Sequence, residues 1–190
     1  MIKQRDFERN KKETLEKLDE CIKEGLVDEK IIPVLKLINE KDEYYTSSSC
    51  YGRVVVLELP EIGDKKNAKW LGKWHHTVNI DDITNAIVKS KTGLLWILAQ
   101  APILHIHSRD LESADEMIKN AVSCGFKNSG FKSIKKNVII EITSTERLDV
   151  PIGKDSKIFC DTNHMSLLID IANDVLIRSQ KKLEKFQESL

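Results

Sequence analysis

Apolar residues recur at three- and four-residue steps in several stretches, which is the spacing that places side chains on one face of an α-helix. This pattern predicts five helices, which cover residues 7–25, the segment between Asp28 and Tyr44, a segment that begins at Asp81 or Asp82, residues 110–125, and residues 161–190. Gly25 and Gly125 are placed to end the first and fourth helices. Pro33 lies deeper than the favoured first helical position, so it marks either a later start or a kink. The polar tail of the last helix is expected to fray.

Continuous or alternating apolar runs predict the strands. These runs cover residues 53–59, 94–98, 102–109, 138–143 and 147–150. Ser144 to Glu146 is short enough for a hairpin-like reversal, and Pro151 is expected to end strand pairing. The pattern predicts an α+β single domain over 1–190, with a central mixed or largely antiparallel sheet flanked by helices and a long C-terminal helix. No G-x-G-x-x-G follows a strand, so the fold is expected to be non-Rossmann.

Composition narrows the class of protein. The chain has 190 residues and is 41% hydrophobic, which suits one substantial core. Thirty Lys and Arg offset thirty Asp and Glu, which argues against non-specific polyanion binding but not against a local basic groove. The four scattered cysteines lack metal-binding or redox spacing and indicate reduced thiols in a cytoplasm. The longest apolar run, 93–106, is interrupted and shorter than the roughly 20 residues that span a membrane, so a soluble, cytoplasmic protein is expected.

Three stretches combine residue types that suit ligand binding. A hydroxyl-rich run, 44–53, precedes the first apolar strand and is read either as a Ser-rich turn or as a ligand-contacting loop. The second, residues 65–76, carries four lysines, two tryptophans and two histidines; its lysines either keep the surface solvated or contact phosphates, and an exposed indole there would suit stacking on a base. The third is the turn 125–130, which either merely connects two elements or cradles an anionic or zwitterionic ligand.

The run Tyr45 to Cys50, followed by Gly52 and Arg53, resembles the signature of the third wybutosine-synthesising protein family. Further matching segments extend the resemblance over nearly the whole chain: Trp74 with His76, Pro102 with Leu104 to Ile106 and Arg109, the turn 125–130, Ser144-Thr145 with 148–151, and Ala172-Asn173. The chain departs from the family pattern at four positions, which are Tyr51, His75, Ser108 and Thr143.

The resemblance implies an S-adenosylmethionine-dependent enzyme that methylates a ring nitrogen (N-4) of a wyosine-type guanosine beside the anticodon of phenylalanine tRNA. On this reading the site residues are His76 and then His105 as candidate proton acceptors; Ser48, Ser49, Arg53, Asn128 and Ser129 as donor-binding residues; and Arg109, Trp74 and Lys73 as substrate-binding residues. Imidazole titrates near neutrality, and guanidinium engages carboxylates bidentately. We expect residues 45–53 and His76, His105, Arg109, Asn128 and Ser129 to converge on one pocket, with no metal. The oligomeric state is left open.

Two functions from other classes remain as alternatives. A non-catalytic tRNA-binding module would use the lysines and tryptophans but would show no affinity for the methyl donor. A metal-dependent hydrolase would draw on Cys50 and the histidines 75, 76, 105 and 107, although no His-Glu-x-x-His spacing supports it. Stoichiometric zinc in the purified protein would favour the hydrolase. Cys50 also invites a nucleophile hypothesis, but ring-nitrogen methylation requires no covalent enzyme intermediate.

Overall fold

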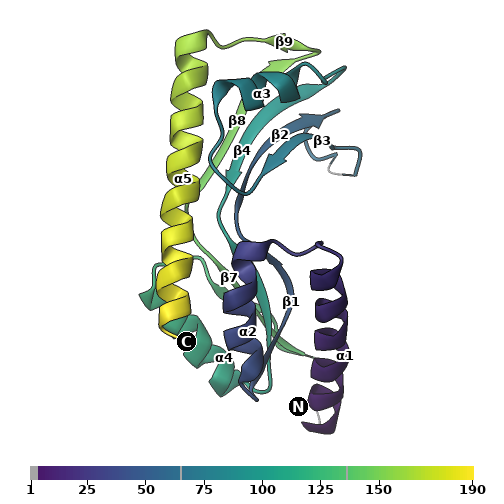
Figure 1. Ribbon diagram of the computed structural model, residues 1–190, viewed down its shortest axis with the longest axis vertical. Coiled ribbons are helices and arrows are strands. Elements are labelled where there is room, and N and C mark those ends of the chain that lie inside the picture. Colours follow the sequence, from purple (N-terminus) through teal and green to yellow (C-terminus); the bar gives the residue numbers. More distant parts are fainter. Residues whose placement is uncertain (1–3, 65, 136) are drawn as a thin grey trace. The chain divides into compact units, whose positions relative to one another are not determined.

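The computed structural model describes residues 4–64, 66–135 and 137–190. Its helices are α1 (Gln4–Lys23), the short 3-10 helix η1 (Glu29–Ile31), α2 (Ile32–Glu40), α3 (Ile80–Ile87), α4 (Leu111–Ser123) and α5 (Thr162–Glu188). Its strands are β1 (Tyr44–Cys50), β2 (Arg53–Leu59), β3 (Lys69–Trp74), β4 (Leu94–Gln100), β5 (Ile103–Ser108), β6 (Gly130–Ser133), β7 (Val138–Thr143), β8 (Arg147–Lys154) and β9 (Lys157–Ile158) (Figure 1). Within these described ranges, no helix is long and apolar enough to cross a membrane.

The chain divides into two compact units, each with its own antiparallel sheet. Unit 1 comprises 1–51, 102–145 and 180–190, and unit 2 comprises 52–101 and 146–179. The α+β class, the antiparallel pairing and the long C-terminal helix are confirmed. The expected central sheet is instead two sheets, and the assignment of 1–190 to one domain stays a prediction.

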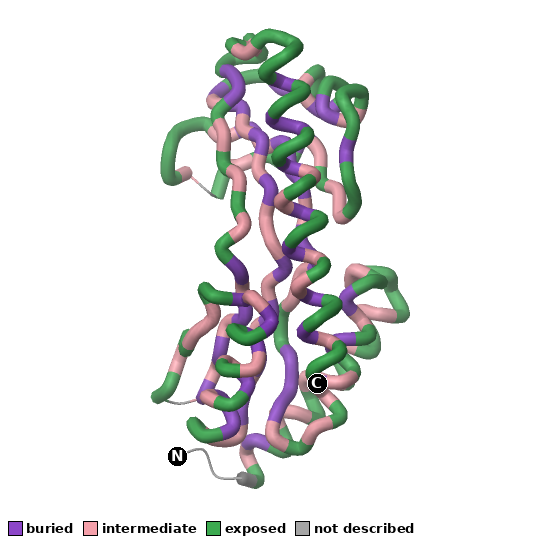
Figure 2. Tube along the Cα trace, turned by 90° about the vertical axis from the view of Figure 1, so that its left-hand side faces the viewer, coloured by how far each residue is buried: buried purple, intermediate pink, exposed green. Residues whose placement is uncertain are grey.

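The sheet of unit 1 has the strand order β1-β5-β7-β6; α2, α4 and the end of α5 cover one face, and α1 contacts the other through Phe7 and Tyr45. Leu104 and Ile106 of β5 alternate with polar neighbours, so their side chains join a core formed with α2, α4 and the end of α5. The expected fraying of the α5 tail is wrong, because Phe186 is fully buried and its ring centroid lies 5.8 Å from that of Phe126. Figure 2 shows the buried positions following the strands and the inner sides of the helices.

The sheet of unit 2 has the order β3-β2-β4-β8-β9, and α3 with the first part of α5 covers one face. Val54 and Val56 of β2 pack into this core, so Val55 between them points to the opposite face. A capping box starts α3: Asn79 accepts from the backbone N–H of Asp82, whose carboxylate accepts from the backbone N–H of Asn79.

Several local predictions are corrected by the strand pairing. Residues 44–50 form strand β1 and not a turn, and β3, β6 and β9 were not predicted. The predicted β7–β8 hairpin is wrong, because the two strands belong to different sheets. Pro151 continues β8, where a register shift between Leu95 and Trp96 of β4 accommodates it. Pro33 marks a later helix start, as one reading expected, because it falls in the first turn of α2.

Candidate functional site

A hydrogen-bonded row of side chains crosses the sheet of unit 1 on the face opposite its core. Ser48 of β1 pairs with His105 of β5, and His105 pairs with Glu141 of β7. The Ser48 hydroxyl lies 2.6 Å from Nδ1 of His105, and Nε2 of His105 lies 2.7 Å from Oε2 of Glu141. Nζ of Lys132 on β6 continues the row at 2.9 Å from Glu141. Four strands therefore contribute one residue each to a continuous polar chain, which we call the serine–histidine row.

The partners of His105 determine its tautomer. The pKa of Glu141 is lowered, first by the hydrogen bond from Lys132 and then by the one with His105, so Glu141 is an ionised acceptor at neutral pH. Because a carboxylate can only accept, Nε2 of His105 must carry the proton that it donates. In the neutral imidazole, Nδ1 is then an acceptor, and the Ser48 hydroxyl donates to it. Glu141 thus leaves His105 ready to take a proton from Ser48.

A bulge in β1 sets the position of Ser48. Asn39 at the end of α2 anchors Thr46, because its Oδ1 accepts from the Thr46 backbone N–H at 2.8 Å and its Nδ2 donates to the Thr46 hydroxyl at 3.0 Å. The register with β5 shifts between Thr46 and Ser48, which leaves Ser47 as the extra residue. The bulge aligns Ser48 with His105.

The turn 125–130 lies on the same sheet, beside Glu141. Gly130 pairs with Glu141, and the backbone N–H of Asn128 donates to the carbonyl of Thr143 at 3.2 Å. The Ser129 hydroxyl donates to the carbonyl of Phe126 at 2.7 Å and accepts from the backbone N–H of Thr143 at 3.2 Å. Ser129 therefore closes the turn, whereas the side chain of Asn128 is exposed.

A cavity of about 330 Å³ adjoins the serines of β1. Its lining combines hydroxyl, cationic, anionic and apolar side chains from α1, from the segment 26–28 and from β1: Thr14, Lys17, Leu18, Cys21, Leu26, Val27, Asp28, Ser47, Ser48 and Ser49. Its volume is within the usual range for small-molecule sites. Ser48 belongs both to this cavity and to the serine–histidine row.

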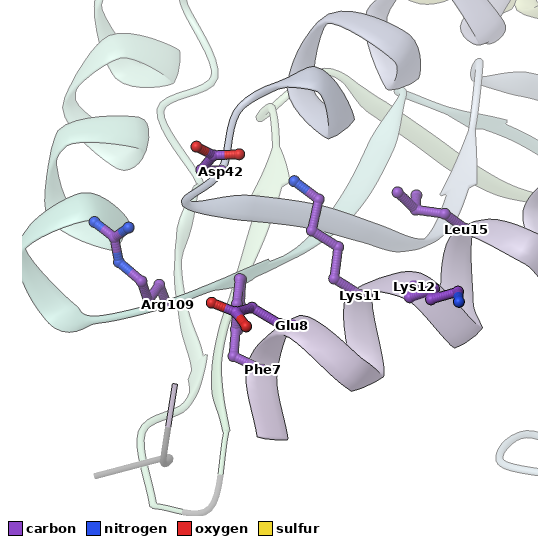
Figure 3. Close-up of a pocket in the computed structure, with 7 residues that line it drawn as sticks. All are labelled: Phe7, Glu8, Lys11, Lys12, Leu15, Asp42 and Arg109. Atoms are coloured by element: carbon purple, nitrogen blue, oxygen red, sulfur yellow. The ribbon is translucent and has the colours of Figure 1, made fainter. Parts of the chain in front are cut away.

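Arg109 lies at the opposite end of β5 from this cavity. Its guanidinium is 3.5 Å from the carboxylate of Glu43 and 3.3 Å from that of Asp110, which caps α4 by accepting from the Ser113 backbone N–H. Arg109 lines a separate cavity of about 440 Å³ with residues of α1, among them Phe7 and Lys11 (Figure 3). The structure therefore does not bring Arg109 to the serine–histidine row, and its role in substrate binding stays a prediction.

His107, two residues before Arg109, faces the same side of the sheet as His105. Its ring stacks on Tyr45, with centroids 4.4 Å apart, and Tyr45 in turn packs against Phe7 of α1. Burial lowers the pKa of His107, and a proton on the neighbouring His105 would lower it further. Among the described residues, Nδ1 of His107 has no hydrogen-bond partner. His107 is thus a neutral packing residue at neutral pH.

The remaining predicted site residues belong to unit 2. Nε of Arg53 donates to Gln100 at 2.8 Å, and its guanidinium lies 4.5 Å from the ring centroid of Trp70. The indole of Trp74 folds over Gly72, where a Cβ would collide with it. Lys73 and His76 are exposed, and Nδ1 of His76 donates to the carbonyl of Thr77 at 2.8 Å. Lys65 of the predicted lysine patch lies outside the described residues.

The sequence interpretation missed Glu141 and Lys132. Residues 138–143 were read as an apolar strand, although Glu141 is its only charged residue and interrupts an isoleucine run. The sequence did contain a signal for Glu141. A single carboxylate that alternates with buried positions along a strand must face the side opposite the core, where it can contribute to a site. His105, its partner, was identified from the sequence, but the pairing of β5 with β7 that joins the two residues was not.

Comparison with known proteins gives consistent matches over nearly the whole length. The family model described as Methyltransferase TYW3 matches residues 9–190. The chain is 48% identical over 186 residues to the tRNA(Phe) 7-((3-amino-3-carboxypropyl)-4-demethylwyosine(37)-N(4))-methyltransferase 1 of Pyrococcus abyssi, covering 97% of this chain and 96% of the relative. It is 45% identical to the corresponding methyltransferase of Methanocaldococcus jannaschii, with coverage of 97% and 96%.

Solved structures share the fold. The PH1069 protein from Pyrococcus horikoshii superposes with a TM-score of 0.93 at 47% identity, covering 97% of this chain and 96% of that one. A hypothetical protein from Aeropyrum pernix has a TM-score of 0.74 at 27% identity, with coverage of 85% and 95%. The family resemblance drawn from the serine run and the five other segments is thereby confirmed, and the chain belongs to the TYW3 methyltransferase family.

Proposed function

We propose that this protein transfers a methyl group from S-adenosylmethionine to N-4 of the 4-demethylwyosine base of phenylalanine tRNA, in the cytoplasm. The activity for which its relatives are named supports the reaction, and the serine–histidine row of unit 1 is the observation that carries it for this chain. Neither the tRNA-binding module nor the metal-dependent hydrolase is favoured by membership of a methyltransferase family.

The reaction requires a proton acceptor because the demethylated nitrogen carries a hydrogen. S-adenosylmethionine supplies an electrophilic methyl group on a sulfonium. The nitrogen loses its N–H bond and gains an N–CH₃ bond, while the sulfonium loses its methyl and becomes a neutral thioether. In our proposal Ser48 takes the proton from the nitrogen as its own proton passes to Nδ1 of His105. Glu141 holds the resulting imidazolium by its hydrogen bond, which makes Glu141 a positioning residue.

The cavity beside the serines suits the methyl donor. Ser48 and Ser49 offer hydroxyls, Asp28 a carboxylate and Lys17 an ammonium, which together match a ligand that carries hydroxyls and charges of both signs. We keep Ser48, Ser49, Asn128 and Ser129 of unit 1 as proposed donor-binding residues, whereas the assignment of Arg53 to the donor stays a prediction because Arg53 belongs to unit 2. We also keep Arg109, Lys73 and Trp74 as proposed substrate-binding residues, and His76 as an alternative proton acceptor.

The direct test incubates the protein with donor labelled in its methyl group and with phenylalanine tRNA purified from cells lacking this protein. Label should appear in the tRNA and, after nuclease digestion and mass spectrometry, in a base methylated at N-4. Binding of tRNA without affinity for the donor would support the non-catalytic module instead. Label in another base would contradict the proposed substrate.

Two adjacent serines provide a matched pair for the site. Ser48→Ala removes the hydroxyl that donates to His105, whereas Ser47→Ala removes an exposed hydroxyl at the bulge. We expect single-turnover methylation to fall about 10²-fold for Ser48→Ala, at the lower end of general acid–base effects. Ser47→Ala should stay within a few-fold of wild type. Equal effects of the two substitutions would remove Ser48 from the proton path.

A further inference from the structure

We propose that the sheet of unit 2 binds unpaired nucleotides of the RNA on its face opposite α3 and α5. The inference rests on the proposed function for its tRNA substrate, and it adds a surface on which that tRNA is held. The surface, which we call the tryptophan platform, consists of Arg53 on β2 and of Trp70 and Lys73 on β3.

Strand register places these three residues on one face. Lys73 pairs with Val55, and Trp70 pairs with Leu57 beyond a bulge in β3. Val55 points away from the core because its neighbours Val54 and Val56 point into it. The side chain of Arg53, two residues earlier on the same strand, contacts the Trp70 ring directly. The bulge residue Leu71 packs into the core and so fixes the strand while its neighbours stay exposed.

The geometry of Trp70 and Arg53 suits base stacking. The Trp70 side chain is 50% exposed, which is unusual for an indole that has no ligand to cover it. The Arg53 guanidinium is already held 4.5 Å from the ring centroid, and Gln100 fixes it from β4. Unpaired bases stack on aromatic rings and on guanidinium planes, so this pair offers two preorganised planar groups. Trp74 is less suited, because its indole folds over Gly72.

Charge complementarity identifies the occupant as a nucleic acid. Strand β3 carries no acidic residue, and its Lys73 lies on the platform face with Arg53 of β2. Lys69 lies on the other face, where it pairs at 2.9 Å with Glu58, which is only 2% exposed. The Lys73 ammonium and the Arg53 guanidinium next to a stacking indole match the alternation of phosphates and bases along an unpaired strand.

A second copy of the chain fits the same surface poorly. Among the described strands, β3 pairs only with β2, so it forms an edge of the sheet. Lysines on an edge strand oppose pairing with another chain, and two copies would bring like charges together. The arrangement therefore favours RNA over self-association.

The test compares Trp70→Ala and Lys73→Gln with matched substitutions at the other edge of the same sheet. Phe159 is an exposed aromatic residue and Lys157 an exposed lysine, both at strand β9, so Phe159→Ala and Lys157→Gln are the controls. Affinity is measured on the full chain with phenylalanine tRNA from cells lacking this protein, and with a single-stranded RNA and a duplex of the same sequence. Sedimentation reports the oligomeric state of each variant.

We expect Trp70→Ala to weaken binding of tRNA and single-stranded RNA by about 5- to 150-fold, with little effect on the duplex. Trp70→Tyr, which keeps a stacking ring, should recover much of the loss. Lys73→Gln should lower the slope of log affinity against log salt by about 0.7. Both control variants should bind like wild type.

Three outcomes would overturn the platform: unchanged RNA affinity of Trp70→Ala and Lys73→Gln, equal losses in the control variants, or an altered oligomeric state without a change in RNA affinity. Failure of the proposed function is distinguishable, because wild type would then bind RNA but transfer no methyl group. If wild type methylates the tRNA while Trp70→Ala keeps its KM for tRNA, the platform alone is wrong.

Discussion

The two units of this protein are built alike but present opposite kinds of surface. Each has an antiparallel sheet with one face packed against its helical core. The second face of each sheet carries polar or exposed groups, although α1 covers part of that face in unit 1 through the contact of Phe7 with Tyr45. In unit 1 that face carries Ser48, His105 and Glu141, joined by hydrogen bonds of 2.6 and 2.7 Å. In unit 2 it carries Arg53, Trp70 and Lys73, of which Trp70 and Lys73 are exposed.

The difference suggests a division of roles between chemistry and binding. A hydrogen-bonded chain with a defined tautomer holds a proton acceptor in one geometry, which is what acid–base catalysis requires. A half-exposed indole beside cationic side chains instead tolerates different nucleotides, because every base has a stacking face. We therefore expect substitutions in unit 1 to lower turnover and substitutions in unit 2 to lower RNA affinity.

The largest effect is expected for His105→Gln. It removes the proposed proton acceptor while it retains polar groups next to Ser48 and Glu141. Single-turnover methylation at saturating tRNA should fall about 10²- to 10⁴-fold, with tRNA affinity unchanged. His76→Gln is the matched control, because His76 is exposed and bonds only locally to the Thr77 carbonyl among the interactions described. A larger loss for His76→Gln would move the proton acceptor to unit 2.

Packing of the α5 tail against unit 1 allows the stabilities of the two sheets to be compared. Phe186 is fully buried in the core of unit 1, so Phe186→Ala should lower the free energy of unfolding by about 3–5 kcal/mol. Hydrogen exchange should accelerate most in β5 and β7 and less in β2 and β4. Uniform acceleration in both sheets would show that the two units unfold as one cooperative body.

Glu141→Gln tests whether Glu141 positions His105. An amide can donate as well as accept, so the tautomer of His105 is no longer fixed. We expect a loss of about 10- to 100-fold in single-turnover methylation and a changed pH profile, whereas Glu141→Asp should recover part of the rate. A lower melting temperature with an unchanged pH profile would reduce Glu141 to a structural role. Lys132→Gln, which removes only the outer ion pair, should have a smaller effect.

The partly buried His107 predicts a pH dependence of stability. Its pKa lies below the ordinary value of 6.5 in the folded protein, so the unfolded chain binds more protons as the pH falls past 6.5. The free energy of unfolding of wild type should therefore decrease in this range. His107→Phe keeps the stacking on Tyr45 but cannot titrate, so urea denaturation between about pH 8 and pH 5 should show a flatter profile. Identical profiles would contradict the lowered pKa.

The smallest effect is expected for Arg109→Ala. Its ion pairs with Glu43 and Asp110 are partly exposed, and such pairs contribute less than about 1 kcal/mol. We expect a small decrease in melting temperature, with a loss of methyl transfer only if Arg109 contacts the substrate as proposed. A strong loss of turnover without a loss of stability would support the sequence-based assignment of Arg109 to substrate binding, and Arg109→Lys should then fall between wild type and alanine.

Amphipathic periodicity was sufficient to predict the helices, but not every strand. Strand β1 was missed because Tyr44, Tyr45 and Thr46 are all buried, which conceals the alternation, and because the bulge at Ser47 shifts the rest. The bulge in β3 likewise interrupts the alternation of buried and exposed residues along that strand. The β7–β8 hairpin was wrongly predicted because a short connection between strands does not reveal that they belong to different sheets.

The site could be predicted only in part, because its geometry depends on pairing between distant strands. Ser48 and His105 were identified from the family resemblance, and the structure joins them. Glu141 completes the row through the pairing of β5 with β7, which no local pattern indicates. The sequence suggested either indole for stacking, whereas exposure favours Trp70 over Trp74.

The central claim is that unit 1 performs the chemistry and unit 2 holds the RNA. The most direct test is single-turnover methylation by His105→Gln and Trp70→Ala, measured side by side over a range of tRNA concentrations at saturating donor. His105→Gln should lower the maximal rate and leave the half-saturating tRNA concentration unchanged. Trp70→Ala should raise that concentration by about 5- to 150-fold and leave the maximal rate near wild type. The same change in the same parameter for both variants would contradict the division of roles.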